Sequence, residues 1–151
     1  MSWVCRSDLA AMLQDITVHA TCVAVAGRAA LIRGASGSGK SALALQLMAY
    51  GAALVADDRT RLWRDGEHLM ADVPSTIKGQ IEARGIGILH APPAGPTPVA
   101  LIVEMDAPLP PRLPPEASET LLGVEIAQVG KTDAGHFSAA VFLYLMHGRA
   151  A

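Results

Sequence analysis

The sequence predicts an α/β domain in which a mixed, largely buried sheet is flanked by helices. A glycine-rich loop, residues 34–41, lies between a strand-like segment and a helix-like segment, which favours this fold class. Further apolar, strand-like segments are separated by turn signals along the rest of the chain. Hydrophobic residues make up 51% of the 151 residues, which is ample for one buried core. We therefore expect a single domain over residues 1–151.

The glycine-rich loop carries the motif with the clearest chemistry. It reads Gly34-Ala35-Ser36-Gly37-Ser38-Gly39-Lys40-Ser41, which fits the phosphate-binding P-loop pattern. Its glycines let successive backbone N–H groups surround the β- and γ-phosphates of a nucleotide, and Lys40 adds a point charge there. Ser41 offers its hydroxyl to Mg²⁺. A Gly/Ser-rich linker is the alternative interpretation, but linkers are not normally flanked by strand and helix patterns.

The segments on either side of the loop predict regular elements. Residues 16–25 are rich in β-branched side chains and predict a hairpin with residues 29–33, the strand that enters the loop. His19 lies on the first of these strands and could come close to the loop. Residues 41–50 predict an apolar helix that packs on more than one side, and Gly51 supplies its left-handed stop.

Two apolar strands are each followed by acids that could bind a metal ion. Residues 52–56 lead into Asp57 and Asp58, and a later strand leads into Glu104 and Asp106. Because ligands lie at the carboxyl ends of strands in open α/β sheets, Asp57 and Asp58 are expected beside the nucleotide. Adjacent acids suit phosphoryl transfer, since one carboxylate can anchor Mg²⁺ while the other accepts a proton. Spacing alone leaves both pairs open.

Weaker patterns predict the remaining elements. Residues 75–80 are ambiguous between a helical turn and a loop. The glycines within residues 81–89 indicate close backbone approach or special dihedral angles. The other expected elements are a helix over residues 8–14, a hairpin of 61–64 with 68–71, strands over 99–104 and 121–129, a proline-rich surface loop over 108–115, and a C-terminal helix over 135–146.

Composition and charge argue against several classes of partner. Twelve basic and fourteen acidic residues leave a formal net charge of −2, and aromatic residues make up 4%, so neither a nucleic-acid surface nor an anionic-membrane surface is expected. Cys5 and Cys22 are too few for a zinc framework or a disulfide scaffold. The N-terminus lacks the order of a signal peptide, and no apolar run approaches a membrane span. We therefore expect a cytoplasmic protein.

Four segments resemble the catalytic domain of bacterial HPr kinase/phosphorylase. They are residues 18–20, 34–41, 54–58 and 81–87, in the order and approximate spacing of that family. A P-loop, an Asp-Asp strand end and Glu-x-Arg-Gly-x-Gly rarely coincide, so the resemblance is specific. It implies a P-loop kinase-like fold, ATP and Mg²⁺ as cofactors, and phosphorylation of a serine on the small phosphocarrier protein HPr. It also implies the reverse reaction, in which inorganic phosphate removes the phosphoryl group.

The resemblance implies roles for individual residues. Lys40 would hold the β- and γ-phosphates, and Ser41 with Glu82 would hold Mg²⁺. His19 matches the family's active-site histidine, although a lone strand histidine is by itself more often structural. Arg84 matches a signature associated with catalysis and partner docking. Without the resemblance, Arg84 is a solvated arginine at a sheet turn.

The resemblance also decides between the two acidic pairs, in favour of Asp57 and Asp58. One of these two would accept the proton in phosphorylation and donate it in phosphorolysis, and the choice between them stays open. The match fades past Val99, and the family's Pro-Gly-Arg-Asn segment has no clear counterpart. Residues 129–136 lie near its place, where Lys131 supplies charge without the bidentate geometry of arginine. The sequence therefore predicts kinase activity and leaves phosphorylase activity open.

The expected assembly and the alternative functions follow from the same comparison. The sequence resembles the short forms of some proteobacteria, which lack the additional N-terminal domain of longer family members. Family members are hexamers, and an apolar C-terminal helix is compatible with a homo-oligomer. Two alternative functions stay open: a kinase for a small metabolite, and a regulatory protein that binds nucleotide without transferring phosphate.

Overall fold

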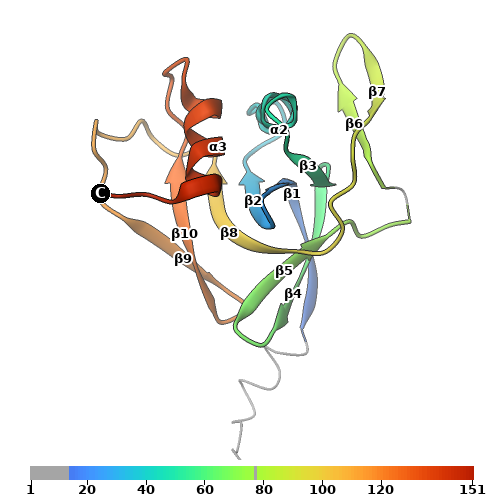
Figure 1. Ribbon diagram of the computed structural model, residues 1–151, viewed down its shortest axis with the longest axis horizontal. Helices are drawn as coiled ribbons and strands as arrows, with labels where there is room; N and C mark the ends of the chain where they lie inside the picture. The colour runs from blue at the N-terminus through green and yellow to red at the C-terminus, as the bar shows by residue number, and fades with distance from the viewer. Residues whose placement is uncertain (1–13, 77) are drawn as a thin grey trace, which may run out of the picture.

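The structure, a computed structural model, describes residues 14–76 and 78–151 (Figure 1). The helix predicted over residues 8–14 lies outside these ranges except for Gln14, which belongs to no helix. The described strands are β1 (Asp15–Val25), β2 (Arg28–Arg33), β3 (Ala53–Ala56), β4 (Arg59–Asp65), β5 (His68–Asp72), β6 (Gln80–Ala83), β7 (Gly87–His90), β8 (Thr97–Glu104), β9 (Ala117–Leu121) and β10 (Val124–Gly130), and the helices are α2 (Lys40–Ala49) and α3 (Phe137–His147).

The main sheet in the described residues is mixed and contains eight strands. Strand β1 is antiparallel to β2, β3 and β4, whereas β2, β8 and β10 run parallel to one another. The pairings β2–β1, β1–β4, β4–β5 and β5–β8 return to the first strand through the parallel pair β8–β2. Five strands therefore form a closed circuit, and the strand that enters the P-loop has a partner on both sides. The predicted mixed α/β fold is confirmed.

Strand β1 belongs to two parts of this circuit. Its first half, up to His19, pairs with β4 and alternates between exposed and half-buried residues. Its second half, Ala20–Val25, pairs with β2 and β3 and is buried throughout. This half consists of small and apolar residues with one threonine, which suits a strand covered on both faces. The predicted hairpin of β1 with β2 is confirmed.

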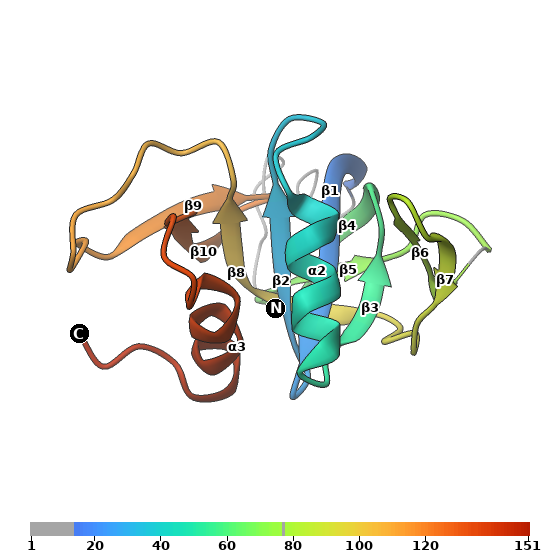
Figure 2. The same cartoon turned by 90° about the horizontal axis from the view of Figure 1, so that it is seen from above.

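Two apolar cores lie on opposite faces of the sheet. The first includes Leu43 and Leu47 of α2, Leu145 of α3, and Ile32 of the sheet. Figures 1 and 2 show both helices on this one side, with α2 across β1 and β2 and α3 beside it. Among the described residues, the second core contains residues from β1, β2, β3, β4, β5, β8 and β10 and no helix residue. The helices therefore cover one face, while the other face is covered by the curling of the sheet itself.

The two helices contact each other through the end of α2. The ring of Tyr50, the C-cap of α2, meets the Phe142 ring edge to face at 5.7 Å between centroids, and its hydroxyl lies 3.2 Å from Ser138 Oγ. Gly51 has φ +117 and its N–H donates to Met48 O at 3.0 Å, so the predicted glycine stop is confirmed. Within the described ranges, no helix is both long enough and apolar enough to cross a membrane.

The predicted strand over residues 121–129 is confirmed from Val124 onward, as β10, but its first residues belong to β9 and a turn. The structure has a hairpin, in which β9 and β10 are joined by a turn at Leu122 and Gly123, with φ of +49 and +80. Leucine rarely adopts positive φ, so the sequence signal for this turn is weak. Arg64 supports the turn from β4, because its Nη1 donates to Leu122 O at 3.5 Å. A tertiary contact thus helps to hold a turn that local sequence does not announce.

The region after β5 resolves two open points. The described residues of 75–79 form a loop rather than a helical turn, and β6 begins at Gln80. Within the described part of the chain, strands β6 and β7 pair only with each other and form a separate hairpin, which Figure 1 shows extending away from the main sheet. Its turn contains Gly85 at φ +86 and leads into Gly87 at φ +140, in keeping with the special dihedral angles predicted there.

Candidate functional site

The P-loop joins the end of β2 to the start of α2. Gly39, the residue before the helix, has φ +100, and the first turn of α2 contains no acidic residue. The helix N-terminus therefore presents free N–H groups and the positive end of its dipole toward the loop, which favours an anion. Lys40 is only 6% exposed, and its Nζ donates to Gly34 O at 2.8 Å and Ala35 O at 3.0 Å. The ammonium is thus held within the loop.

Steric crowding at the start of the loop explains one of its glycines. A Cβ on Gly34 would lie 2.5 Å from Ser38 Oγ and 2.9 Å from Met105 Cβ, and the φ of +154 also disfavours a side chain. Ser38 Oγ is buried and, among the described residues, has no hydrogen-bond partner. A buried hydroxyl without a partner inside a loop of backbone donors fits the oxygens of a bound phosphate.

The later acidic pair supports the P-loop rather than lining its cavity. Asp106 Oδ2 accepts the Ala35 N–H at 2.7 Å. Glu104 Oε2 accepts from Arg33 Nε at 3.0 Å, and the two terminal nitrogens of Arg33 donate to Glu119 at 2.6 and 2.7 Å. The hydrogen bonds to Glu119 raise the pKa of Arg33, and the same contact lowers the pKa of Glu119. These carboxylates therefore have partners that fix the end of β2.

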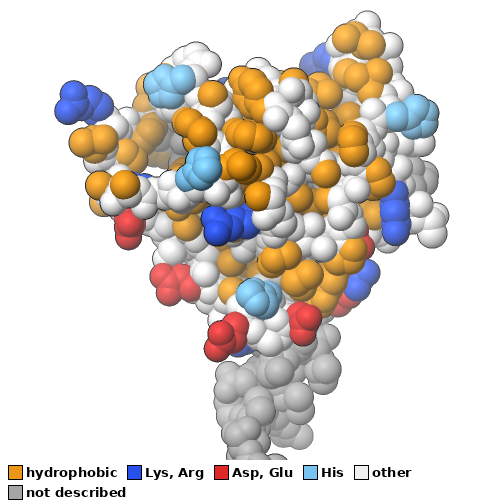
Figure 3. All heavy atoms as spheres, viewed as in Figure 1, with side chains coloured by type: hydrophobic (Ala, Val, Ile, Leu, Met, Phe, Trp, Pro, Cys, Tyr) orange, Lys and Arg blue, Asp and Glu red, His pale blue; other side chains and the backbone are white. Residues whose placement is uncertain are grey.

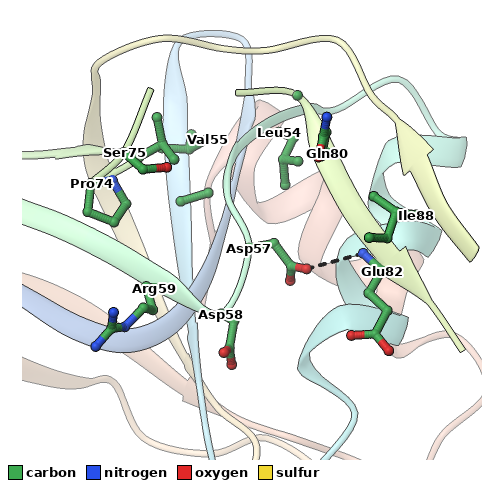
Figure 4. Close-up of a pocket in the computed structure, with 13 residues that line it drawn as sticks. Leu54, Val55, Asp57, Asp58, Arg59, Pro74, Ser75, Gln80, Glu82 and Ile88 are labelled. Carbon is green, nitrogen blue, oxygen red and sulfur yellow. Dashed lines mark hydrogen bonds between the residues drawn. The ribbon is translucent and has the colours of Figure 1, made fainter. Parts of the chain in front are cut away.

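Asp57 links three elements at the carboxyl end of β3. Its Oδ1 accepts from Ser41 Oγ at 3.1 Å and from Thr21 Oγ1 at 3.3 Å. Its Oδ2 accepts the backbone N–H of Glu82 at 3.3 Å, the dashed contact in Figure 4. The P-loop helix, β1 and β6 thus meet at one carboxylate. The Ser41 hydroxyl and the Asp57 carboxylate are hard oxygen donors of the kind that Mg²⁺ prefers.

Asp58 has different surroundings from its neighbour. Its Oδ1 lies 2.7 Å from His19 Nε2, and both side chains are exposed, His19 at 49% and Asp58 at 69%. Its backbone has φ +66, an unusual conformation for a residue other than glycine. Asp57 points toward the backbone of Glu82 in Figure 4, whereas Asp58 points away from it. The two carboxylates therefore face different sides of the site, and Asp58 is the more exposed of the two.

Two adjoining cavities meet at Asp57, Asp58 and Glu82. One, of about 590 Å³, lies beside the P-loop, and the other, of about 500 Å³, lies beside β3 and the loop after β5. Figure 4 shows the second cavity with the two aspartates at its centre. The P-loop cavity is lined by Ser36, Gly37, Gly39, Lys40, Ser41, Ala42, Leu45, Asp57, Asp58, Glu82, Ala83, Arg84 and Ile86.

Most of the residues singled out from the sequence are brought together in the P-loop cavity. Arg84 reaches it from the turn end of β6, and Glu82 from the same strand. His19 does not line the cavity but contacts it through Asp58. Among residues 14–76 and 78–151, no three His, Cys, Asp or Glu side chains form a metal-binding group. A cation here would thus rely on Ser41, the nearby acids and the nucleotide phosphates together.

Sequence reasoning missed Thr21, which contacts both aspartates. Its hydroxyl donates to Asp57 Oδ1, and it accepts the Asp58 N–H at 3.2 Å. The signal was present: Thr21 lies two residues after His19, and residues two apart in a strand face the same side. Thr21 is also the one hydroxyl in the apolar second half of β1, so the sequence could have indicated it as a hydrogen-bonding residue of the same site as His19.

The comparisons with known proteins agree with this geometry. The family described as HPr Serine kinase C-terminal domain matches residues 10–93, more than half of the chain. An HPr kinase/phosphorylase of Nitrosomonas europaea is 43% identical over 58% of this chain and 28% of its own length. One from Caldanaerobacter subterraneus subsp. tengcongensis is 47% identical over 50% of this chain and 25% of its own length.

A solved structure extends the likeness beyond the P-loop half. The Hpr(Ser) kinase/phosphatase from Coxiella burnetii superimposes with a TM-score of 0.74 at 27% identity, covering 87% of this chain and 93% of that one. The sequence matches to the two relatives cover a smaller share of this chain, 58% and 50%. The chain spans about a quarter of the length of these relatives. The fold is thus common to nearly the whole described chain, while the sequence match is concentrated around the site.

Proposed function

This chain belongs to the HPr serine kinase C-terminal domain family, and on that premise we propose that it is an ATP- and Mg²⁺-dependent serine kinase acting on an HPr-like phosphocarrier protein. We also propose that residues 1–151 act as one catalytic domain and that the protein works in the cytoplasm. The observation that carries the proposal is the 3.1 Å contact between Ser41 of the P-loop and Asp57, beside the exposed pair of Asp58 and His19. In this arrangement the proposed nucleotide site lies next to a candidate general base.

Asp58 is the proposed proton acceptor. Its carboxylate is exposed and lies 2.7 Å from His19, so an incoming serine hydroxyl can reach it and the histidine can orient it. As the serine oxygen attacks the γ-phosphorus in line, its proton passes to Asp58, the bond from the γ-phosphorus to the β,γ-bridging oxygen breaks, and ADP leaves. The loop N–H groups and Lys40 neutralise the charge on the transferring group. The reverse reaction would use Asp58 as the proton donor.

Asp57 is the proposed metal-side carboxylate. The oxygen donors that fit Mg²⁺ are the Ser41 hydroxyl and the carboxylates of Asp57 and Glu82, which all line the P-loop cavity. When bound, the ion would neutralise charge between the β- and γ-phosphates. The chain's own contribution is to hold Ser41 and Asp57 together and to leave Glu82 facing the cavity.

The direct test is phosphate transfer to a purified HPr-type carrier. The protein is incubated with ATP, Mg²⁺ and the carrier, and the acceptor is analysed by mass spectrometry for phosphoserine. Asp57→Asn with Asp58→Asn should abolish transfer while ATP binding persists. Asp65→Asn, at the end of β4 and remote from the cavity, is the control and should transfer normally. Unchanged transfer in the double variant would remove the assignment of these acids.

The same experiment separates the alternative functions. Transfer to small-molecule acceptors but to no carrier protein would indicate a metabolite kinase. ATP binding with no transfer to any acceptor would indicate a regulatory protein. Phosphorolysis is measured separately, by adding inorganic phosphate to phosphorylated carrier. We expect it to be slower than transfer, because residues 129–136 supply Lys131 instead of an arginine at the expected place.

A homo-oligomer, a hexamer by family resemblance, is part of the proposal. Its support is the outer side of α3, where Leu143 is 58% and Met146 is 39% exposed. Figure 3 shows hydrophobic side chains gathered over the part of this face where the helices lie, and acidic ones around the turns at the opposite end. An apolar surface of this kind is typical of a contact between protein chains.

A further inference from the structure

We propose that Thr21 is a positioning residue that couples the two aspartates of the site, an inference that rests on the proposed kinase function. Thr21 lies in the buried half of β1 and its exposed fraction is 0%. Its Oγ1 donates to Asp57 Oδ1 at 3.3 Å and accepts the Asp58 N–H at 3.2 Å. A hydroxyl can do both at once because it has one donor hydrogen and two acceptor lone pairs.

The contact with Asp58 fixes an unusual piece of backbone. Asp58 has φ +66, and its backbone is tied to β1 on both sides of the residue. Its N–H donates to Thr21 Oγ1, and its C=O accepts from Ala20 N at 3.1 Å. A residue held at positive φ directs its side chain differently from one in an extended strand. Thr21 therefore helps to set the direction in which the Asp58 carboxylate meets His19.

The contact with Asp57 fixes the opposite side of the site. Thr21 and Ser41 both donate to Oδ1 of Asp57, which leaves Oδ2 to accept the Glu82 N–H. The Thr21 hydroxyl has no access to solvent, so water does not compete for these hydrogen bonds. The buried Thr21 Oγ1 thus links the position of the Asp57 carboxylate to that of the Asp58 carboxylate.

Two substitutions at Thr21 separate the hydroxyl from the shape of the side chain. Thr21→Val keeps the branched shape and removes the hydroxyl, whereas Thr21→Ser keeps the hydroxyl and removes a methyl group. Thr60→Val is the matched control: Thr60 is also 0% exposed, lies on the neighbouring β4, and donates only to Ala20 O, at 2.8 Å. Thermal unfolding of all three variants shows whether each one folds.

The kinetic test uses ATP, Mg²⁺ and a purified HPr-type carrier. Thr21→Val should lower kcat by about 10- to 100-fold, because small displacements of catalytic groups have effects of that order. The KM for ATP should change by less than about threefold, and Thr21→Ser should recover kcat to within about threefold of the parent. Thr60→Val should leave kcat near the parent value. A Thr21→Val variant with unchanged kcat, or an equal loss in Thr60→Val, would overturn the proposal.

A second measurement does not depend on catalysis. Hydrogen exchange at the Asp58 amide, followed by NMR, should accelerate by about tenfold or more in Thr21→Val, because the amide loses its acceptor. The same amide should keep its protection in Thr21→Ser and Thr60→Val. If the parent protein transfers phosphate to no carrier, the proposed function fails, and this exchange rate alone decides on Thr21. Unchanged protection in Thr21→Val would then refute the positioning role.

Discussion

Neighbouring residues with the same side chain have different surroundings at this site. Asp57 is tied by hydrogen bonds to Ser41, Thr21 and the Glu82 backbone, whereas the Asp58 carboxylate contacts only His19 among the described residues. A carboxylate that must receive a proton from a large partner has to be accessible, and Asp58 is 69% exposed. These different surroundings support different proposed roles: Asp58 as the proton acceptor and Asp57 as the carboxylate on the metal side.

Single substitutions should separate these roles. Asp58→Asn should lower kcat by at least about 100-fold, the usual contribution of a general base, with little change in ATP binding. Asp57→Asn should instead raise the Mg²⁺ concentration needed for half-maximal rate by about tenfold or more. Initial rates over a Mg²⁺ titration measure both effects. An Asp58→Asn variant rescued by added Mg²⁺ would exchange the two assignments.

Gly34 offers a test of the loop's geometry. Gly34→Ala places a Cβ 2.5 Å from Ser38 Oγ, and overpacking of this kind typically costs about 1–3 kcal/mol. Relief of this clash would displace the loop and its N–H donors, so ATP affinity should fall, by about tenfold for each 1.4 kcal/mol of binding free energy that is lost. Isothermal titration calorimetry with ATP measures the change. Gly135→Ala is the control, because a Cβ there meets no atom within 4 Å, and it should bind ATP normally.

At the scale of elements, sequence patterns predicted those helices, strands and turns that are determined by residues close together in the chain. The strand, loop and helix from residue 29 to Tyr50, the β4–β5 hairpin and α3 were each visible as periodicity, turn residues or glycine stops. The turn at Leu122 was not, because a contact from Arg64 supports it. The pairing of β5 with β8, which closes the strand circuit, joins residues far apart in the chain and leaves no mark in any single segment.

The site shows the same division. The P-loop was predictable from a short motif with known chemistry, whereas the choice of Asp57 and Asp58 and the role given to Glu82 came from the resemblance to a family. The bridging position of Thr21 and the support of Ala35 by Asp106 were not, since both depend on how strands are placed in space. Hydrogen bonds that reach across the sheet can be found only once its register is known.

The ion pair between β2 and β9 leads to a pH-dependent prediction. The Arg33 contact lowers the pKa of Glu119 below its ordinary value of 4.5, so its stabilising contribution is complete well above that pH. It should be lost as pH falls through the lowered pKa. Partial exposure limits the effect to less than about 1 kcal/mol. Urea unfolding of the parent and of Glu119→Gln should give free energies that differ at pH 7 and converge as the pH falls through the lowered pKa of Glu119. Parallel curves at every pH would contradict this.

At the scale of the whole molecule, the outer side of α3 bears on assembly. Leu143→Lys with Met146→Lys should lower the particle mass measured by light scattering, because charges replace an apolar contact. Glu67→Lys, which reverses a charge at the exposed β4–β5 turn, should leave the mass unchanged. A parent protein that is already a single chain at micromolar concentration would refute the proposed oligomer.

The closed circuit of strands also makes the two walls of the P-loop cavity different in stiffness. The wall that bears the P-loop belongs to strands hydrogen-bonded on both sides, so moving it would break several ladders together. The facing wall, with Glu82 and Arg84, stands on a two-stranded arm whose strands, within the described residues, pair only with each other. A segment held by fewer inter-strand hydrogen bonds opens at a lower free-energy cost. We therefore expect the arm to move more easily than the P-loop wall when the cavity is filled.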